Sequence, residues 1–288
     1  MLEILDKLLS DPRPWAYLTL IFVVFGLERR IPADPAQRIL GPGLFQDAVW
    51  FGVHLVSKAT LYALWLAALH LVYDRYLSFL TLDSLAAWPA PARVAVAILA
   101  GDFLAWLHHY LRHKIPWFWP FHAVHHAQLQ MNLFTDNRVH PLDRLIATTL
   151  TFIPLFMVEA SFPDMLAWAV FLSCYTKFYH ANIRTNFGIL RYLLVTPQSH
   201  RIHHSPELRH RDMNFGVFFS IWDRLFGTQY PASDEYPATG IEDPDFPSER
   251  GRSPLALARS TLSQLVYPFV AIWRSGHKDH EQRDGGMA

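Results

Sequence analysis

The stretch HHYLRHKIPWFWPFHAVHH, residues 108–126, holds six histidines among tryptophan, phenylalanine and proline. Arg112 and Lys114 are its only other charged residues. A second histidine-rich stretch, HRIHH, follows at residues 200–204. Burying a polar group without a partner costs about 1–3 kcal/mol. So many imidazoles beside so much apolar surface therefore predict that the imidazoles bind a common partner.

The spacing of the histidines predicts three helical faces. On an α-helix, residues three and four positions apart share one face. Pro120 and the pair Thr196-Pro197 predict helix starts, and Pro206 predicts a helix end. The patterns HxxxH, HxxHH and HxxHH then present eight imidazoles: His109, His113, His122, His125, His126, His200, His203 and His204.

Metal binding explains these faces better than a cluster of free imidazoles, which would repel one another when protonated and leave ring nitrogens unpaired. Eight histidines are more than one zinc ion takes, so two ions are more economical. Imidazole suits iron, zinc and copper alike, and spacing does not choose between them. His108 points about 100° away from the face of His109 and is interpreted as structural. His54 and His70 are interpreted in the same way.

Composition predicts an all-α membrane protein. Of the 288 residues, 51% are apolar and 17% are charged, below the roughly 25% charged residues of a typical soluble domain. Tryptophan and tyrosine near the ends of the apolar runs are typical of membrane interfaces, although core helices of a soluble protein are the alternative. The balanced net charge gives no reason to expect nucleic acid as a partner. The apolar runs are 14–27, 48–73, 94–111, 145–158 and 165–176.

The runs and the basic residues suggest how the chain is organised. An acidic, proline-rich loop is expected at 229–253, an amphipathic helix bent at Pro268 over 255–273, and a disordered tail at 276–288. Lysine and arginine concentrate around the histidines, so the positive-inside rule predicts a polytopic protein with a histidine-rich helical cap on the cytosolic face. The expected parts are membrane helices at 1–93, a catalytic domain at 94–228 and a C-terminal part at 229–288.

The order of the motifs resembles the sterol desaturase / fatty acid hydroxylase superfamily. The resemblance covers about residues 98–228. It implies an integral membrane, non-haem di-iron enzyme that uses O₂ and two external electrons to hydroxylate or desaturate lipids. It rests on DFLAWLHHYLRH at 102–113, PWFWPFHAVHH at 116–126, TDNRVHPLD at 135–143, YHANI at 179–183, TPQSHRIHH at 196–204 and NFGVFFSIWDRLFGT at 214–228.

The same resemblance implies roles for individual residues. It makes the eight histidines above metal ligands and adds His180, while His140 is either a ligand or a neighbour of one. Asp102 and Asn214 are candidate catalytic residues that support the site. The alternatives are a helix-end or salt-bridge role for Asp102 and ordinary loop chemistry for Asn214. Some members carry a further histidine where this chain has Thr176, which leaves open the number of ligands at one iron.

The function expected from the resemblance is lipid hydroxylation, with desaturation starting from the same hydrogen abstraction. No fused electron-transfer module is visible, so a separate ferredoxin- or cytochrome b5-type donor is expected. One alternative is a membrane zinc metallo-hydrolase, which would need neither O₂ nor reductant. Another is a non-catalytic metal-binding or transport protein. A haem with two axial histidines would leave most of the others unexplained.

Overall fold

The computed structural model of the chain describes residues 12–38, 40–249 and 251–284. These residues form helices and irregular segments, and apart from two isolated bridges they contain no strand. The prediction of an all-α protein is confirmed. The helices are α2 (Pro12–Arg30), α3 (Pro42–Ser57), α4 (Ala63–Val72), α5 (Ala90–Lys114), α6 (Trp119–His126), α7 (Pro141–Met157), α8 (Phe162–His180), α9 (Pro197–His203), α10 (Ile221–Leu225) and α11 (Pro254–Asp284).

Short turns of other helical types connect these helices. Two π-helical turns, η1 and η2, extend α3 and α4 into one long helical stretch, and 3-10 turns lie in the loops. The turns are η1 (Lys58–Tyr62), η2 (Tyr73–Leu77), η3 (Ser78–Leu80), η4 (Asp83–Leu85), η5 (Thr135–Asn137), η6 (Gly188–Tyr192) and η7 (Leu208–His210).

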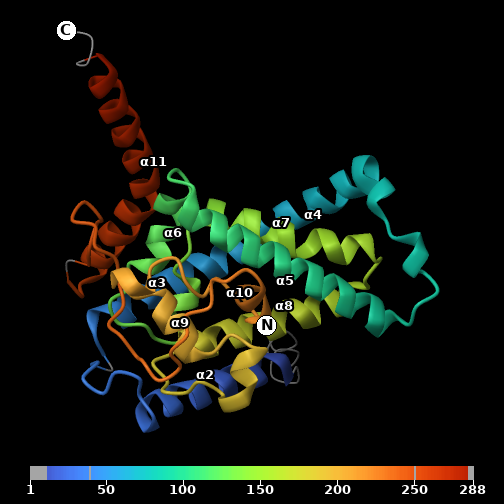
Figure 1. Ribbon diagram of the computed structural model, residues 1–288, viewed down its shortest axis with the longest axis horizontal. Coiled ribbons are helices and arrows are strands. Elements are labelled where there is room, and N and C mark those ends of the chain that lie inside the picture. The colour runs from blue at the N-terminus through green and yellow to red at the C-terminus, as the bar shows by residue number, and fades with distance from the viewer. Residues whose placement is uncertain (1–11, 39, 250, 285–288) are drawn as a thin grey trace, which may run out of the picture.

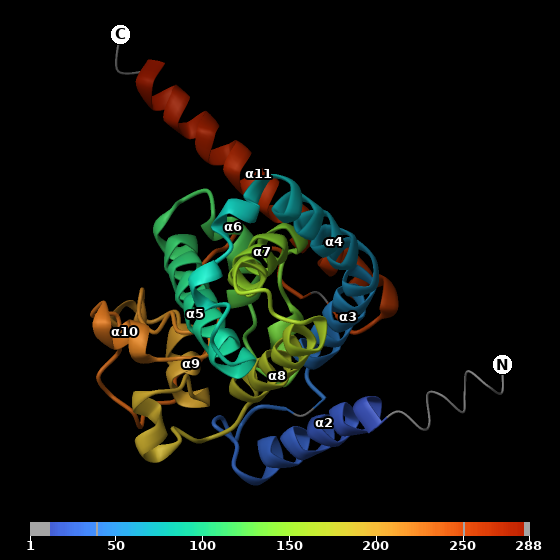
Figure 2. The ribbon, with the colours of Figure 1, turned by 90° about the vertical axis from the view of Figure 1, so that its right-hand side faces the viewer.

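The long helices form a bundle with α7 in the middle. Figure 2 shows α5, α8, α3 and α4 arranged around α7, and α5 packs along α7 over much of its length. Helices α6 and α9 lie towards one end of the bundle (Figure 1), and α10 lies beside α5 (Figure 2). Helix α2 lies along the outside against α8, while α11 packs on α3 and α6 and then projects away. The short helices that carry most of the histidines are therefore held against the ends of long ones.

Three helical stretches among the described residues are long and apolar enough to cross a membrane: Pro42–Leu80, Ala90–Lys114 and Pro254–Ser275. The first two contain the apolar runs 48–73 and 94–111. The other three runs form α2, α7 and α8, as helices were expected, but these helices do not meet the same standard of length and hydropathy. The third stretch is α11, which sequence spacing assigned to an amphipathic helix.

The helix ends follow the predicted chemistry. Pro120 lies in the first turn of α6. Thr196 caps α9 by accepting a hydrogen bond from the Ser199 amide, and Pro197 opens the helix. Residues 229–249 are irregular, as expected, and α11 continues to Asp284 through most of the segment expected to be disordered. Residues 285–288 lie outside the described part of the chain.

Candidate metal centre

Nine histidines converge where α5, α6, α8 and α9 meet. In each of two groups, one ring nitrogen from every histidine lies within 4.8 Å of those of the others. All nine are buried except His113, which is half-buried. The first group is His109, His113, His122, His126 and His203, and the second is His125, His180, His200 and His204.

The two groups lie side by side. The rings of His126 and His204, one from each group, stack with centroids 4.3 Å apart. Each group draws on at least three separated segments of sequence, so neither forms without the tertiary fold. The three helical faces expected from HxxxH and HxxHH therefore come together, and each HxxHH face contributes to both groups.

Backbone carbonyls fix the orientation of four rings. Because a carbonyl only accepts, the Nδ1 atom of each ring carries the hydrogen and its Nε2 atom is left with a lone pair. The bonds are His109 Nδ1 to Phe215 O at 2.8 Å, His125 Nδ1 to Arg138 O at 3.2 Å, His180 Nδ1 to Thr176 O at 2.7 Å and His203 Nδ1 to Met213 O at 2.9 Å.

These tautomers leave the inward nitrogens in an arrangement that suits a cation. The Nε2 atoms of His125 and His180 are 3.0 Å apart, and both carry lone pairs, so they repel each other unless a positive charge lies between them. In the first group, the Nε2 atoms of His109, His113 and His203 are buried with no hydrogen-bond partner. Neutral imidazole nitrogens with unshared lone pairs are the donors that iron, zinc and copper accept. The donor set therefore fits a metal in each group.

Burial keeps the rings neutral. Desolvation lowers the pKa of His203 to about 4 and that of His180 to about 3. Burial also lowers the pKa of the other histidines of α6 and α9 far below the usual value, and neighbouring imidazoles add to this effect. At neutral pH these side chains are therefore ready to bind a metal without releasing a proton.

Asp143, which the motif analysis did not single out, lies beside the first group. One of its carboxylate oxygens is 2.8 Å from Arg112 Nε, and the other is 3.5 Å from His122 Nδ1. His108 also contacts Arg112, at 2.8 Å, and lies outside both histidine groups, in keeping with its structural interpretation. A buried carboxylate behind a histidine orients the ring and increases its basicity. In the sequence, the one feature that could have indicated this role is the position of Asp143 directly after HPL, in the first turn of α7.

Asp102 and Asn214 brace the backbone around the site. The carboxylate of Asp102 accepts from the amides of Phe218 and Phe219 and from Trp222 Nε1 at 2.9–3.0 Å. The alternative salt bridge from Asp102 to Arg112 does not form, since Arg112 pairs with Asp143. Asn214 has a left-handed backbone (φ 60°), donates to the Ser199 carbonyl and accepts from the Tyr230 amide.

Asp223 is a second buried carboxylate that sequence reasoning missed. It accepts from the amides of Phe215 and Gly216, from Trp106 Nε1 and from the Thr228 hydroxyl. These bonds hold the turn whose Phe215 carbonyl orients His109. A single aspartate in a closing motif carries no spacing pattern, and therefore only the fold reveals this role.

His140 lies outside both histidine groups. Its Nδ1 accepts from the Leu142 amide and caps α7, while its Nε2 is 3.1 Å from the Leu265 carbonyl of α11. Both ring nitrogens thus have partners on the backbone. Of the ten histidines proposed from sequence as metal ligands, nine are brought together and His140 is placed apart.

A buried ion pair supports the second group. Lys177 Nζ contacts both carboxylate oxygens of Asp136, at 2.8 and 3.0 Å, and the Asn137 side chain. Lys177 follows Thr176, whose carbonyl accepts from His180. Thr176 stands where some relatives were expected to carry a further histidine, and the second group accordingly contains four histidines and the first five.

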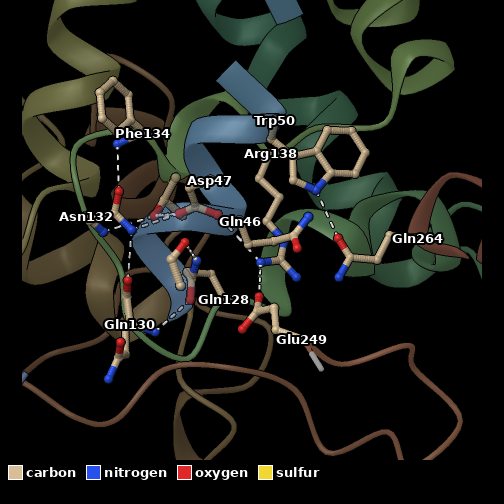
Figure 3. Close-up of polar contacts among 12 residues, drawn as sticks. Gln46, Asp47, Trp50, Gln128, Gln130, Asn132, Phe134, Arg138, Glu249 and Gln264 are labelled. Atoms are coloured by element: carbon tan, nitrogen blue, oxygen red, sulfur yellow. Dashed lines mark hydrogen bonds and ion pairs between the residues drawn. The ribbon is translucent and has the colours of Figure 1, made fainter. Parts of the chain in front are cut away.

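Figure 3 shows a polar network in which Arg138 lies between Asp47 of α3 and Glu249 of the C-terminal part. The carbonyl of Arg138 orients His125, and its guanidinium donates to the Val124 carbonyl. The same guanidinium pairs with Glu249 at 2.5 Å and lies 3.5 Å from Asp47 of α3. Two further bonds tie α3 to α11: Gln46 Nε2 to Thr261 Oγ1 and Trp50 Nε1 to Gln264 Oε1.

Comparison with known proteins finds a family model and several relatives that match this part of the chain. Residues 94–228, which include all nine histidines, match the model of the family Fatty acid hydroxylase. The chain is 30% identical over 199 residues to Ornithine lipid hydroxylase OlsE of Rhizobium tropici, covering 67% of this chain and 54% of the relative. It is also 30% identical over 160 residues to Alkylglycerol monooxygenase of Homo sapiens, covering 54% of this chain and 35% of the relative.

A third relative is named for a different activity. Very-long-chain aldehyde decarbonylase GL1-1 of Oryza sativa subsp. indica is 27% identical over 219 residues, which are 70% of this chain and 34% of the relative. The chain thus spans about half the length of the first relative and about a third of the other two. No solved structure gives a significant match.

Proposed function

We propose that the protein is a membrane-bound oxygenase that hydroxylates a lipid C–H bond, because residues 94–228 match the fatty acid hydroxylase family model. The reaction takes one lipid, O₂, two electrons and two protons to one hydroxylated lipid and one water. The observation that carries the proposal is the pair of buried histidine groups whose inward nitrogens present lone pairs to one another.

Two iron ions would be held by the two groups, one in each. Bound iron would supply the activation of O₂ and the oxidising power that an unactivated C–H bond requires, which no side chain provides. The chain's own part is to keep nine imidazoles neutral and oriented. Burial keeps the rings neutral, backbone carbonyls orient four of them, and the Asp143 carboxylate lies 3.5 Å from a fifth, that of His122.

The surroundings favour a lipid substrate. Two of the candidate membrane stretches reach the centre: α5 carries His109 and His113, and Asp47 at the start of the stretch Pro42–Leu80 lies 3.5 Å from Arg138. Two relatives are named for lipid substrates, an ornithine lipid and an alkylglycerol. We assign the chain to the same broad class, and desaturation would begin with the same hydrogen abstraction.

Electrons would come from a separate ferredoxin- or cytochrome b5-type protein. We place the centre on the cytoplasmic side, where the basic residues around it agree with the positive-inside rule. We also propose that residues 94–228 form the catalytic domain between N-terminal helices (1–93) and a C-terminal part (229–288). The network around Arg138 links all three parts, so the flanking parts would support the centre directly.

Isotope labelling of lipids tests the proposal. Cells expressing the wild-type chain, His125→Ala or the control His70→Ala would be grown under ¹⁸O₂, and their lipid extracts compared by mass spectrometry. His70 is half-exposed, pairs with Asp74 and lies outside both groups. We expect a lipid with one ¹⁸O atom from the wild type and His70→Ala, and none from His125→Ala.

Two results would overturn the proposal. One is a labelled lipid that is as abundant in His125→Ala as in the wild type. The other is a lipid change that proceeds without O₂ and takes its oxygen from water, which is the behaviour of a metallo-hydrolase.

A further inference from the structure

An exposed apolar surface lies on η6 and α10, outside the candidate membrane helices. We call it the η6–α10 patch. Its members are Ile189, Leu190, Tyr192, Leu193, Leu225 and Phe226. Ile189 is 80% exposed and Leu225 is 71% exposed, and the other four are between 45% and 54% exposed. Contiguous apolar surface of this kind marks an interaction site on a folded protein.

Hydrogen bonds make the patch one surface although its two segments are about thirty residues apart in sequence. The carbonyl of Arg191 in η6 accepts from Ser220 Oγ at 2.8 Å and from Arg224 Nη2 at 3.1 Å. The amide of Ser220 donates to the Leu193 carbonyl at 2.9 Å. The apolar side chains of both segments are therefore held in a fixed relation.

The patch is at the depth of a candidate membrane helix. The ring of Phe226 stacks on Trp106 of α5 at 4.5 Å and on Phe103 at 5.9 Å, and Figure 2 shows α10 beside α5. A hydrocarbon core about 30 Å thick takes about 20 helical residues at 1.5 Å each. Counted from Ala90, where α5 begins, that length reaches beyond Trp106. A hydrocarbon core that begins at Ala90 would therefore extend to the depth of Phe226.

The charges of the patch match a phospholipid surface. Arg191 and Arg224 lie over the ring of Tyr192, at 4.9 and 4.6 Å from its centre. Between residues 185 and 195 and between 217 and 227 the one acidic residue is Asp223, which is buried and fully hydrogen-bonded. Arginine beside apolar side chains reaches towards phosphate while its stem stays in the hydrocarbon, and tyrosine prefers the same boundary.

We infer that the η6–α10 patch inserts into one leaflet of the bilayer, with Arg191 and Arg224 at the phosphates. It is an attachment separate from the spanning helices. Trp106, against which Phe226 packs, is three residues before His109, a rise of about 4.5 Å along α5. The hydrocarbon would thus reach to within a helical turn of the metal centre. With the proposed function, this would place hydrocarbon beside the site that takes a lipid substrate.

Site-specific fluorescence in a bilayer tests the inference. Single cysteines would be placed on a Cys174→Ser background and labelled with an environment-sensitive dye, in the full chain. The test positions are Ile189→Cys and Leu225→Cys. Leu99→Cys, on the exposed side of α5, is the membrane control, and Leu208→Cys, 75% exposed beside the charged residues Glu207 and Arg209, is the water control.

The labelled chains would be placed in nanodiscs of phosphatidylcholine and phosphatidylglycerol, with spin-labelled phosphatidylcholine as the lipid-side quencher and iodide as the water-side quencher. We expect dyes at 189 and 225 to be quenched by the spin-labelled lipid as strongly as the dye at 99 and several-fold more than the dye at 208. Iodide should quench the dye at 208 most.

Other outcomes overturn the inference. If 189 and 225 respond to iodide like 208 while 99 responds to lipid, the patch faces water although α5 spans the bilayer. If 189 and 225 are shielded from both quenchers, protein covers the patch, as in a pair of chains. Neither result bears on the oxygenase chemistry, which the isotope experiment tests separately.

Discussion

At the scale of single residues, the carboxylate of Asp143 is the clearest test of how the rings are oriented. Loss of a carboxylate behind a metal-binding histidine typically lowers metal affinity or activity 10–100-fold. Asp143→Asn should cause a loss of about this size, because the amide keeps the volume of the side chain but not the negative charge that faces His122 and Arg112. Asp83→Asn, at an exposed position in η4, is the matched control.

The measurement is the rate at which iron is lost to a chelator. Faster loss in Asp143→Asn than in Asp83→Asn is the expected result. Equal rates in the two variants would show that Asp143 does not hold His122 in place for the metal.

The placement of His140 gives a second prediction. Both of its ring nitrogens are occupied by the backbone, so His140→Ala should retain the metal of the wild type. It should lose the cap of α7, which costs about 1 kcal/mol and lowers the thermal midpoint by a few degrees. Elemental analysis and thermal unfolding in detergent check the two parts. A variant that lost half of its metal would place His140 among the ligands.

Sequence reasoning could group the histidines because spacing on a helix is a local property. HxxxH and HxxHH put nitrogens on one face wherever the helices lie, and the structure brings those faces together. His140 and His180 both rested on the family resemblance, and only the fold distinguishes their surroundings. Asp143 and Asp223 were missed because a lone aspartate has no periodicity.

At the scale of elements, the turn from 214 to 228 is held by buried carboxylates. Asp102 of α5 accepts three hydrogen bonds from donors in this turn. Asp102→Ala would leave these buried donors unsatisfied, at a cost of about 1–3 kcal/mol each. Asp102→Asn keeps one acceptor oxygen and should recover part of that loss. Chemical unfolding in detergent, together with the rate of lipid hydroxylation, checks this prediction.

A positioning role predicts that stability and rate fall together in Asp102→Ala and recover together in Asp102→Asn. If Asp102→Asn were as stable as the wild type but inactive, the carboxylate would act on the reacting groups directly, and the positioning account would be wrong.

The sequence pattern predicted which apolar runs form helices, but it did not predict which of these helices could span a membrane or which lies inside the bundle. All five apolar runs form helices, but α2, α7 and α8 do not reach the length and hydropathy of a span, while α11 does. Hydropathy along a sequence does not show which helix lies inside the bundle. The central position of α7, covered by α5, α8, α3 and α4, is a property of packing alone (Figure 2).

At the scale of the whole molecule, the buried pair of Arg138 and Glu249 joins the C-terminal part to the centre. Removing one partner of a buried ion pair costs about 3–5 kcal/mol when the other charge is left unpaired. Arg138 keeps Asp47 at 3.5 Å, so the loss here should be smaller than that. Glu249→Gln should therefore lower the thermal midpoint clearly. Asp245→Asn should hardly change it, since the pair of Asp245 with Arg274 is exposed and worth about 0–1 kcal/mol.

Thermal unfolding of the two variants in the same detergent provides the comparison. Because Arg138 also orients His125 through its carbonyl, we expect Glu249→Gln to lose metal on heating before the control does. Equal midpoints would mean that residues 229–249 are attached to the centre only loosely.

The central claim is that the two histidine groups each hold an iron ion. The most direct measurement is the metal content of chain purified after iron-replete expression, for the wild type, His109→Ala and His200→Ala. We predict about two irons per chain in the wild type and less iron in both variants. His109→Ala should lose iron from the first group, and His200→Ala should lose iron from the second group. Zinc at full occupancy under the same conditions, or a metal content unchanged in both variants, would contradict the account.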